Sequence, residues 1–214
     1  SIRALMQKYA PYEIPAVPEQ IPVIEIPQIQ LTKTTDALTY IKKQKPVTSD
    51  SPLTFEQLEQ GYGYVLYKKR FTQPINGTLK VPGLRDFATV YVNGKKVGEL
   101  NRVFNSYEMP IKIPFNGSLE ILVENMGRIN YGAEIVNNLK GIIAPVSIND
   151  YEITGGWEMY KAPFAEVPKV ENSTEVKTGR PVVYSGNFDL KKQGDTFLNM
   201  SKMGKGIVFV NGHN

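Results

Sequence analysis

"FATVYVNGKKVGEL", residues 87–100, places Val, Tyr and Leu on both sides of an Asn-Gly pair. β-Branched and aromatic residues favour strands, and Asn-Gly is a preferred pair in a two-residue hairpin turn because both residues tolerate a positive φ. We therefore predict a β-hairpin with Asn93 and Gly94 at its tip. The turn accounts for both residues, so we assign them no chemical role.

A later stretch repeats this pattern. "VVYSGNFDL" (182–190) leads to "IVFVNGHN" (207–214), as "VLYKKRF" (65–71) leads to the hairpin. A Phe stands 22 residues before the Asn of the pair in the first copy and 23 residues before it in the second. Matched spacing of this kind indicates an internal repeat. We predict two copies of one sandwich, the second incomplete, with residues 206–214 forming an edge strand and its turn.

The remainder of the chain is dominated by short apolar runs separated by Gly, Asn and Pro, which is typical of an all-β sandwich or jelly roll. The strand at 118–125 alternates apolar and polar residues, so one of its faces should be wet. One short helix is predicted near 54–60, where Thr54 and Gln57 can form a capping box. The predicted strands are 63–71, 118–125, 141–149, 181–190, 195–201 and 206–212.

Three segments are expected along the chain. Residues 1–49 begin with the last turns of a helix within 1–10 and continue through a Pro-rich extended segment, because prolines forbid helix. That segment should include an edge strand at 21–32, a candidate to pair with the second sandwich. Residues 50–150 form the first sandwich, and residues 151–214 form the second, truncated one.

Composition excludes several classes of site. The 214 residues include no Cys and a single His, His213, so disulfides, thiolate metal sites and a His-based triad are excluded within this chain. The aspartates are dispersed, so we predict neither a metal site nor a cofactor. The net charge of +4 comes from short, scattered basic runs, which favours a solvated surface over a nucleic-acid interface. No apolar run approaches the roughly 18 residues that span a bilayer, so no membrane partner is predicted.

Four motifs, in chain order, carry a resemblance to a known family. They are "LTFEQLEQGYGYVLYKKRF" (53–71), "ENMGRINYGAEIVNNLKGI" (124–142), "GGWEMYKAPF" (155–164) and "GKGIVFVNGHN" (204–214). Together they resemble segments of the family 35 glycoside hydrolases, the β-galactosidases, over nearly all of residues 50–214.

The resemblance implies a catalytic (β/α)8 barrel followed by two galactose-binding-like jelly rolls, of which this chain would be the C-terminal, non-catalytic part. Residues 1–10 would be the exit from the barrel. The barrel would carry the acid/base Glu and the nucleophile Glu of a retaining mechanism, and neither motif occurs here. We therefore expect no enzymatic activity from this chain alone. Its implied partners are the barrel of the same parent protein and, through that barrel, the galactoside substrate. The compartment stays open, with the periplasm or the exterior of a bacterium favoured.

Four residues are candidates for sugar contact, and none is predicted to be catalytic. Tyr131 lies in a loop bounded by Gly and Asn, where its ring either meets the apolar face of a sugar or packs against the sandwich. The resemblance implies the first, since a Tyr of this motif reaches the rim of the barrel's sugar pocket, and Arg128 and Asn130 would orient the loop or contact the barrel. Trp157 is the single Trp, and core or interface packing is favoured for it over stacking on a sugar.

Three functions are compatible with these features. The first is an accessory region that braces the barrel and adds one loop to the sugar site. The second is an independent carbohydrate-binding module for galactosides, and the third is a protein-interaction sandwich. Sugar affinity of the chain by itself separates the second from the other two.

Overall fold

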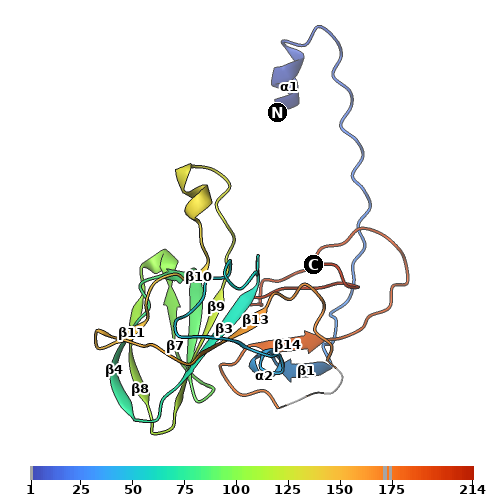
Figure 1. Ribbon diagram of the computed structural model, residues 1–214. Helices are drawn as coiled ribbons and strands as arrows, with labels where there is room; N and C mark the ends of the chain where they lie inside the picture. The colour runs from blue at the N-terminus through green and yellow to red at the C-terminus, as the bar shows by residue number, and fades with distance from the viewer. Residues whose placement is uncertain (1, 171–172, 174) are drawn as a thin grey trace. The chain divides into compact units, whose positions relative to one another are not determined.

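The computed structural model describes residues 2–170, 173 and 175–214. The chain divides into two compact units (Figure 1). The larger unit comprises residues 31–185 and 208–214, and the smaller unit comprises residues 2–30 and 186–207.

The larger unit is an antiparallel β-sandwich. One sheet has six strands in the order β2-β13-β3-β9-β6-β7, with bounds Val47–Ser49, Trp157–Ala162, Tyr64–Arg70, Ser118–Glu124, Phe87–Val92 and Lys95–Asn101. The other has four strands in the order β12-β11-β4-β8, with bounds Tyr151–Glu152, Ser147–Ile148, Ile75–Lys80 and Glu108–Ile113. A short pair joins β5 (Leu84–Arg85) to β10 (Gly141–Ile142). All these pairings are antiparallel, and the predicted all-β class is confirmed.

Side chains from both sheets meet in one hydrophobic core. Successive residues of a strand face opposite sides, so every second residue of β3, β6 and β9 points into this core. Its buried members include Val65, Tyr67, Val90, Val92, Leu119, Ile121 and Val123 from the first sheet, and Leu79, Ile111, Ile113 and Ile148 from the second. Because burying one such aliphatic side chain contributes about 1.5–3 kcal/mol, this core dominates the stability of the unit.

The predicted hairpin is confirmed. β6 and β7 pair antiparallel, and the turn between them has Asn93 at φ 50° and Gly94 at φ 73°. The second Asn-Gly pair adopts a similar turn, with Asn211 at φ 51° and Gly212 at φ 88°. There Val210 and His213 exchange two backbone hydrogen bonds of 2.8 and 3.0 Å. The turns of the two copies therefore match in conformation as well as in sequence.

The strand at 118–125 was predicted to have one wet face, and this is wrong. All residues of β9 are buried except the last, Glu124, which is half-buried. The face of the sheet that was predicted to be wet is covered by α2 (Ala37–Ile41). Leu38 and Ile41 of α2 form a second hydrophobic cluster with residues of β3, β6, β9 and β13. Glu120 is buried there and pairs with Lys42 at 2.5 Å.

The short helix predicted near 54–60 is instead a hydrogen-bonded turn. The capping box does form, since Thr54 Oγ1 accepts the Gln57 N–H at 3.2 Å and Gln57 Oε1 accepts the Thr54 N–H at 2.9 Å. The chain then reverses at Glu59, whose φ is 52°, and the Gln60 N–H donates to the Phe55 carbonyl at 2.8 Å. A residue in this left-handed region ends a helix, so only one turn is made.

The segment at 21–32 does not form the predicted edge strand. In the structure it carries one isolated parallel bridge, from Val23 to Asp195. Its prolines lack the N–H groups that a ladder needs. The strand in this part of the chain is β1 (Lys33–Asp36), which pairs antiparallel with β14 (Val182–Ser185). The predicted helix within 1–10 is confirmed as α1 (Ile2–Gln7) in the smaller unit.

Three other predicted strands are broken or missing. The 141–149 strand is divided between β10 and β11. No strand is assigned within 195–201 or 206–212, which are described throughout; their only bridges are those of Asp195 and Val210. An apolar run becomes a strand only where a neighbouring strand accepts its backbone hydrogen bonds, and these two segments have no such neighbour among the described residues.

Candidate functional site

One long loop leaves the end of the sandwich between β9 and β10. This segment, residues 126–139, is called the 126–139 loop below, and it extends beyond the strands in yellow in Figure 1. It contains one short 3₁₀ helix, η2 (Ala133–Asn137), which has no buried residue. Three of the four predicted site residues lie on this loop.

The structure places these three residues differently. Tyr131 is 90% exposed, and Asn130 is exposed beside it. Arg128 lies nearer the sandwich, where its guanidinium donates to the Gly61 carbonyl and pairs with the Glu56 carboxylate. The loop therefore offers Tyr131 to its surroundings while Arg128 contacts the body of the domain.

Trp157 belongs to the core and does not join the other three. Its exposed fraction is 0%, and its indole N–H donates to the Ile153 carbonyl at 3.0 Å. A sugar cannot reach a ring that is enclosed on both faces. Trp157 is therefore a packing residue, the interpretation that the sequence favoured, and its candidacy as a sugar contact is withdrawn.

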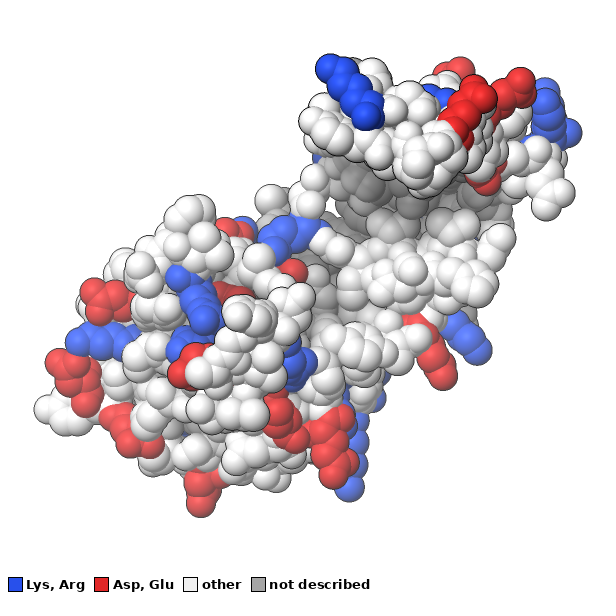
Figure 2. Space-filling model, turned by 90° about the horizontal axis from the view of Figure 1, so that it is seen from above, with Lys and Arg blue, Asp and Glu red and all other residues white. Residues whose placement is uncertain are grey.

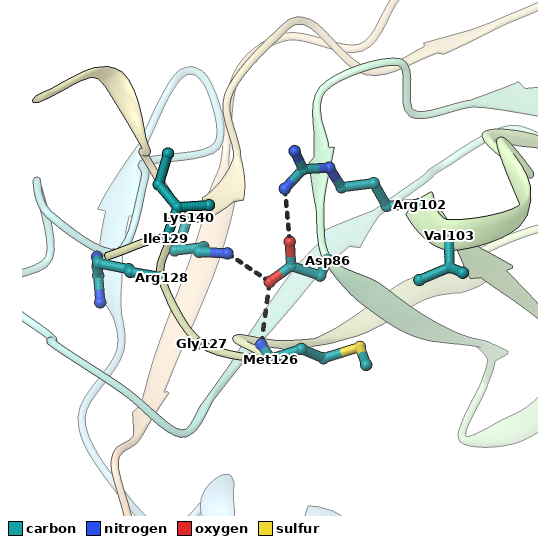
Figure 3. Close-up of a pocket in the computed structure, with 8 residues that line it drawn as sticks. All are labelled: Asp86, Arg102, Val103, Met126, Gly127, Arg128, Ile129 and Lys140. Atoms are coloured by element: carbon teal, nitrogen blue, oxygen red, sulfur yellow. Dashed lines mark hydrogen bonds and ion pairs between the residues drawn. The ribbon is translucent and has the colours of Figure 1, made fainter. Parts of the chain in front are cut away.

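An open hollow of about 410 Å³ lies at the base of the loop. Figure 3 shows Asp86 between two cations within it, Arg102 and Lys140. Lys140 follows the loop, Asp86 lies between β5 and β6, and Arg102 begins the 3₁₀ helix η1 (Arg102–Phe104). The other lining residues are Val103, Met126, Gly127, Arg128 and Ile129.

Asp86 is the centre of the polar contacts in this hollow. Its Oδ2 accepts from Lys140 Nζ at 2.7 Å and from the Met126 N–H at 3.0 Å, and its Oδ1 accepts from Arg102 Nη1 at 2.9 Å. The side chains of Lys140 and Asp86 are only 2% and 8% exposed. Burial of this depth makes the loss of a partner costly.

Glu56 is a second carboxylate that binds both ends of the loop. Besides Arg128, it accepts the backbone N–H of Lys140 at 3.1 Å. The Lys140 carbonyl in turn accepts the Phe55 N–H at 2.9 Å. Lys140 is thus held by its side chain, its N–H and its carbonyl.

The surroundings of both carboxyl groups lower their pKa and so favour the ionised form. Burial alone would raise the pKa of Asp86, but the hydrogen bonds from Lys140, Met126 and Arg102 outweigh it and lower the pKa below 3.8. Burial likewise opposes ionisation of Glu56, and the contacts with Arg128 and the Lys140 N–H lower its pKa below 4.5. A glycosidase acid needs a raised pKa to hold its proton at neutral pH, so neither group suits that role.

Sequence reasoning did not identify this polar cluster. Asp86 lies between β5 and β6, and Lys140 lies 54 positions later, just before β10, so no local sequence pattern connects them. The only hint in the sequence was indirect, since Lys140 is part of the "ENMGRINYGAEIVNNLKGI" motif. Among the described residues, no group of three or more His, Cys, Asp or Glu side chains could hold a metal ion.

Apolar side chains are exposed around the hollow. Of the residues that line it, Val103, Met126 and Ile129 are exposed. Phe104, next to Val103 on η1, and Val136 on η2 are also exposed. Several exposed apolar residues near one site are more informative than scattered ones, because they favour contact with another surface.

Charge is mixed over the visible face of the molecule. In Figure 2, basic and acidic side chains are interspersed, and neither sign gathers into a continuous patch. Within the described part of the chain, no helix is long and apolar enough to cross a membrane.

Comparisons with known proteins locate the sandwich within a family. Residues 52–163 match a family model described as "Beta-galactosidase, first all-beta domain", and residues 181–214 match one described as "Beta-galactosidase, galactose-binding domain". The first match covers the strands β3 to β13 and the whole 126–139 loop.

Relatives of known name extend this likeness. The chain is 32% identical over 201 residues to a β-galactosidase of Xanthomonas manihotis, covering 94% of this chain and 33% of that protein. It is 28% identical over 229 residues to β-galactosidase 1 of Dictyostelium discoideum, covering 94% and 34%. It is 29% identical over 245 residues to the β-galactosidase of Homo sapiens, covering 100% and 35%. The chain thus spans about a third of the length of these relatives.

Among solved structures, a GH2 β-galacturonidase from Eisenbergiella tayi aligns with 66% of this chain and 26% of its own, at 18% identity. The TM-score is 0.29, which is too low to establish a shared fold.

Proposed function

Because this chain belongs to the β-galactosidase family, we propose that it is a non-catalytic β-sandwich region of a larger β-galactosidase. In that protein the sandwich braces the catalytic barrel, and the 126–139 loop forms part of the rim of the sugar site. The galactoside is then a partner of this chain only through the intact enzyme. The sandwich supplies a rigid support, and the barrel supplies the two carboxyl groups of the reaction.

The exposed Tyr131 is the observation that carries this proposal. An aromatic ring that is 90% exposed at the end of a long loop contributes little to the fold of its own domain. Tyr combines an apolar ring face with a hydroxyl, and this combination suits the apolar C–H face and the hydroxyl groups of a sugar. Its neighbour Asn130, also exposed, adds an amide that can donate and accept.

The exposed apolar residues around the hollow support the bracing role. Val103, Met126 and Ile129 line the hollow at the base of the same loop that carries Tyr131. Phe104 on η1 and Val136 on η2 are exposed as well. A domain that docks there covers these side chains and brings the loop to the docked surface. One interface at this hollow would therefore both brace the barrel and bring Tyr131 to the sugar site.

The sugar-site role is tested in the intact parent enzyme with Tyr131→Ala. We expect KM for a galactoside to rise severalfold, because a contact with the bound sugar is lost. Tyr151→Ala is the matched control, since Tyr151 is 80% exposed on β12 and does not belong to the 126–139 loop, so its loss should leave KM unchanged. An unchanged KM for Tyr131→Ala would reject the role of the loop.

The non-catalytic assignment is tested with the 214-residue chain alone. We expect no hydrolysis of lactose or a nitrophenyl galactoside, because the two carboxyl groups of the reaction belong to the barrel of the proposed parent enzyme. Turnover that persists through rigorous repurification would contradict it.

A second candidate function is an independent carbohydrate-binding module. The match of residues 181–214 to a model described as a galactose-binding domain favours it. The burial of Trp157 speaks against it, because the single Trp is not available for stacking. Galactose titration of the isolated chain by NMR separates the two functions: millimolar or tighter binding supports the module, and unmoved resonances support the accessory role.

A further inference from the structure

The two ends of the 126–139 loop are held by the same pair of carboxylates. Asp86 accepts the N–H of Met126, where the loop begins, and the ammonium of Lys140, which follows its last residue. Glu56 accepts the guanidinium of Arg128 near the beginning and the N–H of Lys140 at the end. We propose that Asp86 and Glu56 act together as positioning residues that fix the 126–139 loop and so set the direction in which Tyr131 is presented.

The interior of the loop cannot fix its own position. Every residue from 126 to 137 is exposed, so no buried side chain anchors this span. Two side-chain contacts support the loop locally: Asn125 Oδ1 accepts the Gly127 N–H at 2.9 Å, and Asn138 Oδ1 accepts the Ile129 N–H at 3.2 Å. Both lie near the ends of the loop. The orientation of Tyr131 therefore depends on how firmly the ends are held.

The two carboxylates reach the loop from different directions. Glu56 comes from the turn that precedes β3, and Asp86 comes from the junction of β5 and β6. Each contacts both ends, so the loop is cross-braced, and a shift of one end disturbs the bonds of both carboxylates. Arg102 completes the arrangement by holding the second oxygen of Asp86, which prevents the carboxylate from rotating away from Lys140.

The positioning role is tested by hydrogen exchange on the 214-residue chain. Asp86→Asn and Glu56→Gln each weaken a charge-assisted bond, so amide exchange within residues 126–140 should rise by about tenfold or more. Amides of the central strands β3 and β9 should keep their exchange rates, which separates loop release from general loss of stability. Glu99→Gln is the matched control, because it breaks an exposed ion pair with Lys96 and should leave the loop unchanged.

The outcomes separate this inference from the function on which it rests. Glu56 is 32% exposed and Asp86 only 8%, so we expect Glu56→Gln to fold even where Asp86→Asn does not. If Glu56→Gln leaves amide exchange in residues 126–140 unchanged, the positioning role of Asp86 and Glu56 is overturned, whatever the loop does in the parent enzyme. In that enzyme, Glu56→Gln should raise KM more than it lowers kcat. Faster amide exchange in the loop without a change in KM would support the positioning role and contradict the sugar-site role of Tyr131.

Discussion

Replacing Lys140 with Met removes a buried cation while keeping most of the aliphatic stem. The ammonium lies 2.7 Å from Asp86 Oδ2, with both side chains almost fully buried. Breaking a buried ion pair costs about 3–5 kcal/mol when the remaining charge is left unpaired. Here Asp86 keeps Arg102 at 2.9 Å and the Met126 N–H at 3.0 Å, so we expect Lys140→Met to lower the free energy of unfolding by about 2–3 kcal/mol.

The measurement is urea unfolding followed by the fluorescence of Trp157. This residue is the single Trp and lies in the sandwich core, so its emission reports the unfolding of the larger unit. The midpoint should fall without a change in slope, because the surface exposed on unfolding stays the same. Lys80→Met is the control, since the pair of Lys80 with Asp150 is largely exposed and should contribute little. Equal midpoints for the two variants would refute the reasoning.

Three further predictions concern the same domain. Gly141→Ala should lower the free energy of unfolding by about 2–4 kcal/mol, because φ is +95° and the new Cβ would lie 2.4 Å from Tyr67 Oη; Gly127→Ala, with the same sign of φ but open space, should cost less in the same urea titration. Folding lowers the pKa of Asp86 and of Glu56 from 3.8 and 4.5, so both carboxylates stabilise the fold fully above those pH values and lose this effect as the pH falls through their lower folded pKa values. The urea midpoint of the wild type should therefore fall more steeply below about pH 4 than that of the Asp86→Asn, Glu56→Gln double variant. In that variant Lys140, Arg102 and Arg128 have no carboxylate to pair with. Galactose should leave the emission of Trp157 unchanged in the isolated chain, and a saturable shift would contradict its assignment to the core.

Local signals in the sequence predict the hairpin and the core strands well. Asn93 and Gly94 both adopt the positive φ that their turn requires, and β6 pairs with β7, the next strand along the chain. The apolar run at β3 predicts a strand, although its partners β9 and β13 lie far away in the sequence. The error at β9 has a non-local cause, because the helix that covers its second face comes from residues 37–41. Alternation of polar and apolar residues in the sequence could not reveal that Glu120 is buried against Lys42.

The candidate site was predictable only in its exposed part. Gly and Asn around Tyr131 indicate a loop, and the loop does expose that residue. The contacts that hold the loop join Glu56, Asp86 and Lys140 from three separate segments. Their pairing depends on the packing of the sandwich, so neither residue type nor spacing could predict it.

We propose that the 126–139 loop forms part of the sugar site of a larger β-galactosidase. Hydrogen exchange on that intact enzyme, with and without galactose, tests it most directly. We predict slower amide exchange in peptides covering residues 126–139 when galactose is bound. Equal exchange in these peptides, with slowing elsewhere in the same protein, would contradict the claim.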